Sequence, residues 1–129
     1  MELQDQARLY SLSQLYVKIM TEYDGNDIYC DLIIPKKLAV RMVKETDNVL
    51  AFYHTKPHWP VHIVVTTKRH VPSLLELTDP TTSELIDVVK EVAKDIKDNY
   101  GACRVVTNLG KYQDSKHLHI HVSSGKVKE

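Results

Sequence analysis

The 129-residue chain predicts an α+β fold in which one long helix packs on a mainly antiparallel sheet. Three observations support this: alternating apolar and polar segments between residues 39 and 65, a helical apolar stripe over 79–100, and two short strands at 103–107 and 117–122. Strands, then a helix, then strands favour a helix layered on a sheet. We expect a single domain over 1–129, with an N-terminal helical extension at 1–26 and a core at 27–125.

The first half of the chain predicts one helix and three strands. Residues 5–23 have an amphipathic helical pattern, which the turn-forming residues 24–27 end. Strands are expected at 39–43, 49–53 and 61–65, with a turn at 46–48. A loop is expected at 56–60, because its two prolines, Pro57 and Pro60, exclude regular pairing there.

The second half contains the clearest helix, over 79–100. Asp79 is the expected N-cap, with Pro80 at the first helical position, and Gly101 supplies the stop. The apolar stripe that faces the sheet consists of Leu85, Val88, Val89, Val92 and Ile96.

The composition gives no global field that would attract nucleic acid or a membrane surface. Seventeen basic residues balance 17 acidic ones, so any bound anion requires a local site. The two cysteines, Cys30 and Cys103, match no metal-binding spacing. The first residues lack the features of a signal peptide, and no apolar run approaches the roughly 20 residues of a membrane span. A cytoplasmic protein with free thiols is therefore expected.

A histidine triplet near the C-terminus carries the chemistry. His117, His119 and His121 alternate along a predicted strand and therefore share one face, while the residues between them point to the core. Imidazoles two residues apart on a strand can chelate a metal ion. They can equally act on a phosphate, since neutral imidazole is a nucleophile near pH 7 and protonated neighbours stabilise negative charge. The triplet by itself leaves both possibilities open.

The order of motifs along residues 28–125 resembles the histidine triad (HIT) family, in particular its bacterial and Hint-like members. Residues 116–122 resemble its H-φ-H-φ-H-φ-φ signature. Residues 29–33 resemble its I-F-C-K-I-I segment, and residues 43–52 its E-x-D-x-x-L-A-F hairpin. A third upstream motif, P-x-x-P-x-H-h-L-v-x-P-K-x-H, is matched by Pro57, Pro60, His62, Val64, Lys68, Arg69 and His70.

This resemblance implies a HIT-like fold, a homodimer with one continuous sheet, and cleavage of purine nucleotide conjugates at the α-phosphate. Such conjugates include nucleoside phosphoramidates and dinucleoside polyphosphates. His119 would attack the phosphate, and the backbone carbonyl of His117 would fix its tautomer. His121 would hold the phosphate oxygens beside His62, the fourth histidine. No metal or other cofactor, nucleic acid or membrane is required.

Several polar residues would bind the substrate, and two depart from the family pattern. Asn108 and Gln113 match residues that contact the phosphates or the leaving group. His54 stands where the family has Asp or Asn on the ribose hydroxyls, so nucleoside selectivity is expected to differ. Asp114, followed by Ser115, stands where many members have Ser or Thr. The acid at this position would favour an amine leaving group.

The family's Cys-x-x-Cys zinc motif is reduced here to Asp27 and Cys30. With a histidine, these two residues could form only a weaker metal site. Two alternatives to an enzyme remain: a nucleotide-binding module with little turnover, and a metal-binding protein that uses the histidine face.

Overall fold

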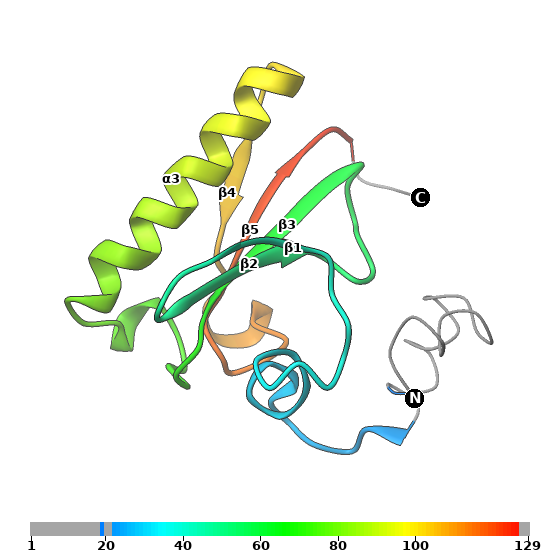
Figure 1. Cartoon of the computed structure of the whole chain (residues 1–129), viewed down its shortest axis with the longest axis vertical. Coiled ribbons are helices and arrows are strands. Elements are labelled where there is room, and N and C mark those ends of the chain that lie inside the picture. The colour runs from blue at the N-terminus through cyan, green and yellow to red at the C-terminus, as the bar shows by residue number, and fades with distance from the viewer. Residues whose placement is uncertain (1–18, 20–21, 127–129) are drawn as a thin grey trace.

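A five-stranded antiparallel sheet with one long helix forms the protein, which we describe from a computed structural model for residues 19 and 22–126 (Figure 1). The strands follow the order β1-β2-β3-β5-β4, and every neighbouring pair is antiparallel. Their bounds are Met42–Glu45 (β1), Val49–Tyr53 (β2), Val61–Thr67 (β3), Arg104–Val106 (β4) and His119–Ser124 (β5). The predicted α+β fold is confirmed. The predicted N-terminal helix at 5–23 lies almost entirely outside the described residues.

The long helix α3 spans Thr81–Tyr100 and packs on one face of the sheet. The prediction that Asp79 caps it was wrong: Pro80 occupies the N-cap position without a side-chain cap bond, and the Asp79 carboxylate lies 3.4 Å from the Ser83 hydroxyl. The predicted C-terminal stop is confirmed. Gly101 adopts a φ of 85°, and its N–H donates to the carbonyl of Lys97.

Two of the predicted strands begin two or more residues later than expected. β1 begins at Met42 rather than residue 39, since its first residue paired with β2 is Met42, opposite Phe52. The pairing continues to the turn, where the Thr46 N–H donates to the Val49 carbonyl. β5 begins at His119 rather than residue 117. The preceding residue, Leu118, directs its N–H to the Val71 carbonyl instead of to a strand.

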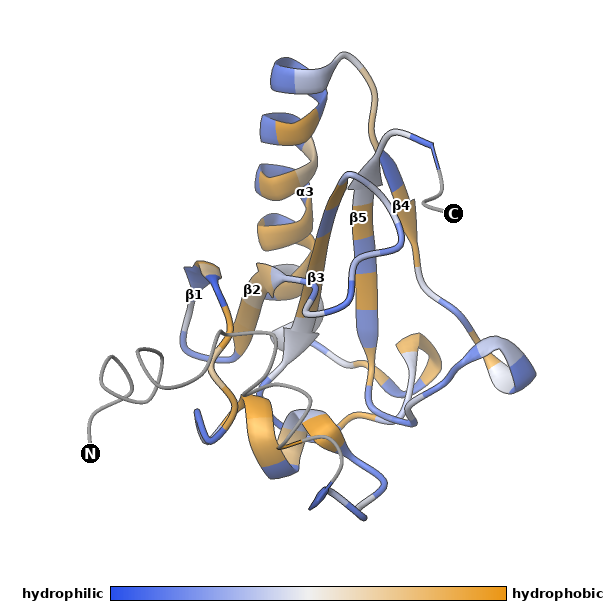
Figure 2. Ribbon diagram, turned by 90° about the vertical axis from the view of Figure 1, so that its right-hand side faces the viewer, coloured by the Kyte–Doolittle hydropathy of each residue, from blue (hydrophilic) through white to orange (hydrophobic). Residues whose placement is uncertain are grey.

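Apolar side chains fill both faces of the sheet. Successive strand residues point to opposite sides, and along β5 hydrophilic and hydrophobic residues alternate, as the bands in Figure 2 show. On the α3 face, Ile120 and Val122 join the larger core with the helix stripe. On the other face, Leu50, Phe52 and Val64 pack against Tyr29–Ile33 (η1), a π-helical segment. His119 and His121 therefore lie on the face opposite α3.

Two short 3-10 helices complete the described elements, Leu74–Glu76 (η2) and Gly110–Tyr112 (η3). Both cysteines are free, as predicted. In the described part of the chain, no helix has the length and apolar character needed to cross a membrane.

Candidate active site

A cavity of about 280 Å³ lies on the sheet face opposite α3. Five residues predicted to form the site line it: His54, Asn108, Asp114, His119 and His121. Four residues that the sequence did not single out for this role also line it: Tyr29, His58, Trp59 and Val106. The cavity is therefore built mainly from aromatic and imidazole rings.

Strand pairing fixes the order of the side chains across the cavity. His54 follows β2, and its N–H donates to the carbonyl of His62 on β3. His121 on β5 lies opposite Val64 of β3 on one side and Val106 of β4 on the other. The order from β2 to β4 is thus His54, His62, His121, Val106. Asp114 comes from the connection between β4 and β5.

His119 presents one free ring nitrogen. Its Nδ1 lies 2.7 Å from the backbone carbonyl of His117. A carbonyl only accepts, so Nδ1 carries the proton and Nε2 holds a lone pair in the neutral ring. Tyr29 stacks on this ring at 5.2 Å with an interplanar angle of 23°. Burial lowers the pKa of His119, which keeps the ring neutral and nucleophilic near pH 7.

His62 and His121 form a directed hydrogen-bonded pair. The backbone N–H of His58 donates to Nδ1 of His62 at 3.1 Å, so the His62 proton resides on Nε2. That N–H donates to Nδ1 of His121 at 2.7 Å. The remaining nitrogen of His121, Nε2, must then carry a proton, which makes it a hydrogen-bond donor. Burial and the neighbouring imidazoles lower the pKa of His62 to about 3 and that of His121 to about 4.

His54 stacks on His62 and has the same tautomer. The two ring centroids are 4.3 Å apart, with an interplanar angle of 19°. The backbone N–H of Lys56 donates to Nδ1 of His54 at 3.0 Å, so the proton is on Nε2. Burial, followed by the nearby His58 and His119, lowers the pKa of His54 to about 4. Near pH 7 this imidazole is neutral.

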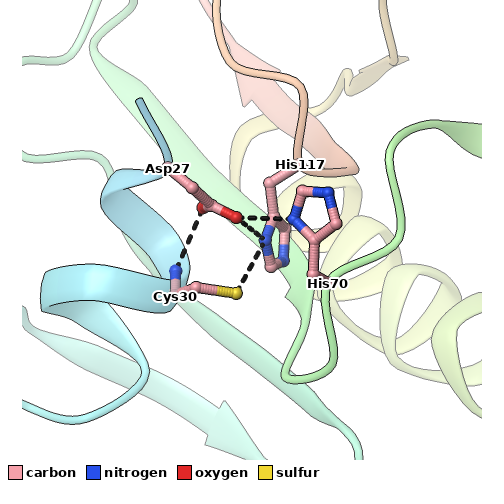
Figure 3. A group of neighbouring side chains, drawn as sticks. All are labelled: Asp27, Cys30, His70 and His117. Atoms are coloured by element: carbon pink, nitrogen blue, oxygen red, sulfur yellow. Dashed lines mark hydrogen bonds and ion pairs between the residues drawn. The ribbon is translucent and has the colours of Figure 1, made fainter. Parts of the chain in front are cut away.

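His117 belongs to a second cluster, with Asp27, Cys30 and His70, none of which lines the cavity (Figure 3). Its buried ring donates from Nε2 to the Thr67 carbonyl at 2.7 Å, and its Nδ1 lies 3.1 Å from Oδ2 of Asp27. The same carboxylate oxygen lies 2.6 Å from Nδ1 of His70, and the other accepts from the Cys30 N–H. Asp27 therefore joins three separate segments of the chain.

The acid in this cluster is held in its charged form. Burial raises the pKa of Asp27, but the Cys30 amide and the His117 and His70 side chains outweigh it and bring the pKa to about 2. Burial, together with the neighbouring Asp27 carboxylate, raises the pKa of the Cys30 thiol to about 11. The cluster thus contains a carboxylate and a protonated thiol.

The donor set of the second cluster fits a divalent transition metal. The ligand atoms of Asp27, Cys30, His70 and His117 all lie within 4.8 Å of one another. The bond from His117 Nε2 to the Thr67 carbonyl directs Nδ1 toward the other three, as an outer-shell carbonyl does for a metal-binding histidine. The structure thus supplies two histidines where the sequence suggested one.

A second set, His54, His62 and His121, also has ligand atoms within 4.8 Å of one another. A metal on Nε2 of His62 would displace its proton to Nδ1, which already faces the His58 N–H. Two donors would then face each other, so this set is a poor metal site. The three triad histidines do not converge on one point, since His117 belongs to the first set and His121 to the second.

Two predicted substrate-binding residues do not line the cavity. Gln113 is buried and its Nε2 donates to the Pro72 carbonyl at 2.6 Å, which anchors the loop before β5. The Ser115 hydroxyl is buried without a hydrogen-bond partner among the described residues. Sequence reasoning also gave no role to His70 or His58. The clustering of aromatic residues with prolines just before His62 was a usable signal for His58.

The comparisons with known proteins agree with this fold and site. The sequence model of the HIT domain matches residues 32–127. A HIT-like protein of Azospirillum brasilense is 30% identical over 110 residues, which cover 81% of this chain and 89% of the relative. The chain therefore belongs to the histidine triad family.

Two solved structures extend the comparison. A histidine triad protein from Clostridium difficile is 33% identical with a TM-score of 0.67, covering 81% of this chain and 94% of that one. A structure titled as a hypothetical histidine triad nucleotide-binding protein, from Sulfolobus tokodaii, is 31% identical with a TM-score of 0.67 and covers 78% and 72%.

Proposed function

We propose that the protein is a nucleotide hydrolase or nucleotidyl transferase that cleaves a purine nucleotide conjugate at its α-phosphate. The observation that carries this proposal is the free Nε2 of His119, which the His117 carbonyl orients within a cavity that His121 also lines. A relative described as nucleotide-binding, at 31% identity, supports the substrate class. The leading candidates are nucleoside phosphoramidates and dinucleoside polyphosphates.

In the first step, Nε2 of His119 attacks the α-phosphorus while the bond to the leaving group breaks. The leaving group takes that electron pair and, where it is an amine, also takes a proton from water. The histidine ring becomes positively charged as the P–N bond forms, and its Nδ1–H strengthens the bond to the His117 carbonyl. The donor Nε2–H of His121, held by His62, stabilises the phosphate oxygens. Water then attacks phosphorus, breaks the P–N bond and releases the nucleoside monophosphate.

The polar residues on the β4–β5 side would select the leaving group. The Asn108 amide lines the cavity and would contact phosphate oxygens or the leaving group. Asp114 would repel a polyphosphate and attract an amine, which favours a phosphoramidate. Gln113, and with it the neighbouring Ser115, would act by holding this loop in place, because neither side chain lines the cavity.

A divalent metal, where present, would be held by Asp27, Cys30, His70 and His117. It would supply a structural cross-link between η1, the segment after β3 and the residue before the catalytic strand. The proposed chemistry needs no metal, since the imidazoles of His119 and His121 provide both nucleophile and donor.

The proposal is tested by intact-protein mass spectrometry after brief mixing with an adenosine phosphoramidate at mildly acidic pH. We expect a mass gain of one AMP, accompanied by AMP release. His119→Ala should abolish both while nucleotide binding persists. Mixing with AMP alone is the control and should leave no adduct. Binding without an adduct or AMP release in the unmodified protein would favour a nucleotide-binding module instead.

We also propose that two copies pair through β4. β4 is an edge strand, and Val105 and Val106 on it are exposed. Beside it, an open groove of about 900 Å³ against α3 is lined by Ala93, Ala102, Cys103 and Val105 together with Gly101 and the charged residues Lys90, Glu91, Lys94 and Lys97. Exposed strand edges that carry apolar side chains are usually covered. Light scattering should give a dimer, and Val105→Arg a monomer; an unchanged mass in the variant would refute this interface.

A further inference from the structure

His54 offers the cavity a hydrogen-bond donor that the proposed chemistry does not use. Its ring lies on the β2 flank and lines the cavity with His119 and His121. Nδ1 is occupied by the Lys56 N–H, so Nε2 carries the proton and is the only polar atom left to a ligand. No described residue accepts a hydrogen bond from it.

The stacked ring of His62 carries the same Nε2–H group, but there it already donates a hydrogen bond within the protein. His62 has the same tautomer, set by the His58 N–H, but its Nε2–H already donates to His121. The two rings thus form one layer in which a single N–H, that of His54, remains for a ligand. Because Nδ1 is occupied, His54 cannot accept the proton of a sugar hydroxyl.

An anionic oxygen is the partner that suits this donor best. A phosphate oxygen only accepts, and a hydrogen bond to an ionised acceptor is about twice as strong as a neutral one. A hydroxyl would accept from His54 but would need another acceptor for its own proton. Burial holds the pKa of His54 at about 4, so the ring meets the ligand as a neutral donor.

The surroundings of His54 reinforce this preference. His58 comes from the same loop and also lines the cavity, and the exposed Lys56 lies between them in sequence. Asp114 is the only carboxylate among the lining residues, and it enters from the β4–β5 connection, across the sheet from His54. The β2 flank therefore carries donors and a cation, and the opposite flank carries the acid.

We propose that His54 defines a subsite for a second phosphate of the substrate, in addition to the phosphate that His119 attacks. This inference rests on the proposed function for the position of the first phosphate. The second phosphate could belong to a polyphosphate chain or to a phosphorylated ribose. Both sources present the same acceptor oxygens to Nε2–H, so the experiment must separate them.

The test is a binding experiment that needs no turnover. Calorimetry with the His119→Ala protein in chelator-treated buffer at pH 7 would compare AMP, ADP and adenosine 3′,5′-bisphosphate. We expect ADP or the bisphosphate to bind about tenfold more tightly than AMP. Preference for ADP would identify a polyphosphate chain, and preference for the bisphosphate a phosphorylated ribose. If both bind no more tightly than AMP, the proposal is overturned.

Second-site variants assign the preference to His54. Adding His54→Ala should remove the tenfold gain and leave AMP affinity within about twofold, and His54→Gln, which keeps an N–H donor, should retain part of the gain. Lys56→Ala keeps the backbone N–H that sets the tautomer and should retain most of it. A gain that survives in His54→Ala, or that disappears with Lys56→Ala instead, would contradict the role of His54.

The proposed function and this subsite fail in different ways. If the unmodified protein forms no AMP adduct, the catalytic proposal fails, while the binding comparison can still show a His54-dependent second phosphate. If catalysis occurs without any preference for a second phosphate, only the subsite is refuted. A long-range ¹H–¹⁵N spectrum of the imidazoles adds a direct readout, because the second phosphate should shift Nε2 of His54 and leave His70 unchanged.

Discussion

The protein places histidines in two adjoining regions whose partners differ. Outside the cavity lining, His117 and His70 share the carboxylate of Asp27. In the cavity, the rings of His54 and His62 are paired only with backbone amides and another imidazole. The residue type is the same, but in the first region a carboxylate hydrogen-bonds the imidazoles, whereas in the second none of the described residues brings a carboxylate into hydrogen-bond contact with these rings.

This difference gives the histidines of a single sequence motif two different roles. Both ring nitrogens of the buried His117 are occupied, since Nε2 bonds the Thr67 carbonyl and Nδ1 lies against the Asp27 carboxylate. His54, His62 and His121 each accept a hydrogen bond at Nδ1 and carry a proton on Nε2, whereas His119 donates from Nδ1 and keeps Nε2 as a nucleophile. His117 and His119 are only two residues apart on the chain. The ring of His117 nevertheless supports the backbone, whereas the ring of His119 is available for chemistry.

The largest effect should come from removing the acid. Asp27→Ala removes the carboxylate that accepts from the Cys30 N–H and lies against His70 and the buried His117, and taking one partner from buried polar groups costs about 1–3 kcal/mol, more when that partner is charged. We expect a loss of about 3 kcal/mol, because the Asp27 side chain is only 14% exposed and several groups lose their partner. Urea denaturation in chelator-treated buffer measures the free energy of unfolding. Asp31→Ala, at an exposed acid of the same segment, is the matched control and should change it little.

An Asp27→Ala protein as stable as the control would show that the carboxylate does not hold His117. Partial recovery in Asp27→Asn is expected, since the amide oxygen can still accept a hydrogen bond while the charge is lost. Equal losses in Asp27→Ala and Asp31→Ala would point to a general effect of this segment rather than to the cluster.

The sequence predicted the sheet and the long helix because these depend on local pattern, whereas the resemblance to the histidine triad family indicated the cavity residues His54, Asn108 and Asp114. Alternation placed His119 and His121 on one face, and Gly101 marked the helix end. The Asp27 cluster depends on tertiary contacts over long sequence separations, so neither His70 nor the orientation of the His117 ring could be predicted. Register also depends on pairing partners, which explains the shifted start of β5.

The tautomers of the histidines also could not be predicted from the sequence. Whether His54 accepts or donates is decided by one backbone amide, that of Lys56, in a loop whose prolines only indicated irregular structure. A pattern of residue types indicates which donor, acceptor or nucleophile roles a side chain can take. The hydrogen-bond partners that the fold supplies decide which of these roles remains available.

A smaller effect should distinguish the two regions by pH. The pKa values of His54, His62 and His121 lie at about 4, 3 and 4, below the ordinary 6.5. Between pH 6.5 and about 4, the unfolded chain therefore binds more protons than the folded one, and stability falls as pH falls through this window.

His54→Gln removes one of these groups and should make the decline shallower, by at most about 1.4 kcal/mol per pH unit. Urea denaturation at several pH values between 7 and 4.5 measures it. Asp27 has a pKa of about 2, below its ordinary 3.8, so its own contribution is lost only at more acidic pH. Asp27→Ala should therefore lower the whole curve without changing its slope in this window. A slope that changes with Asp27→Ala but not with His54→Gln would mean that the acid-paired cluster, rather than the cavity, controls the response to mild acid.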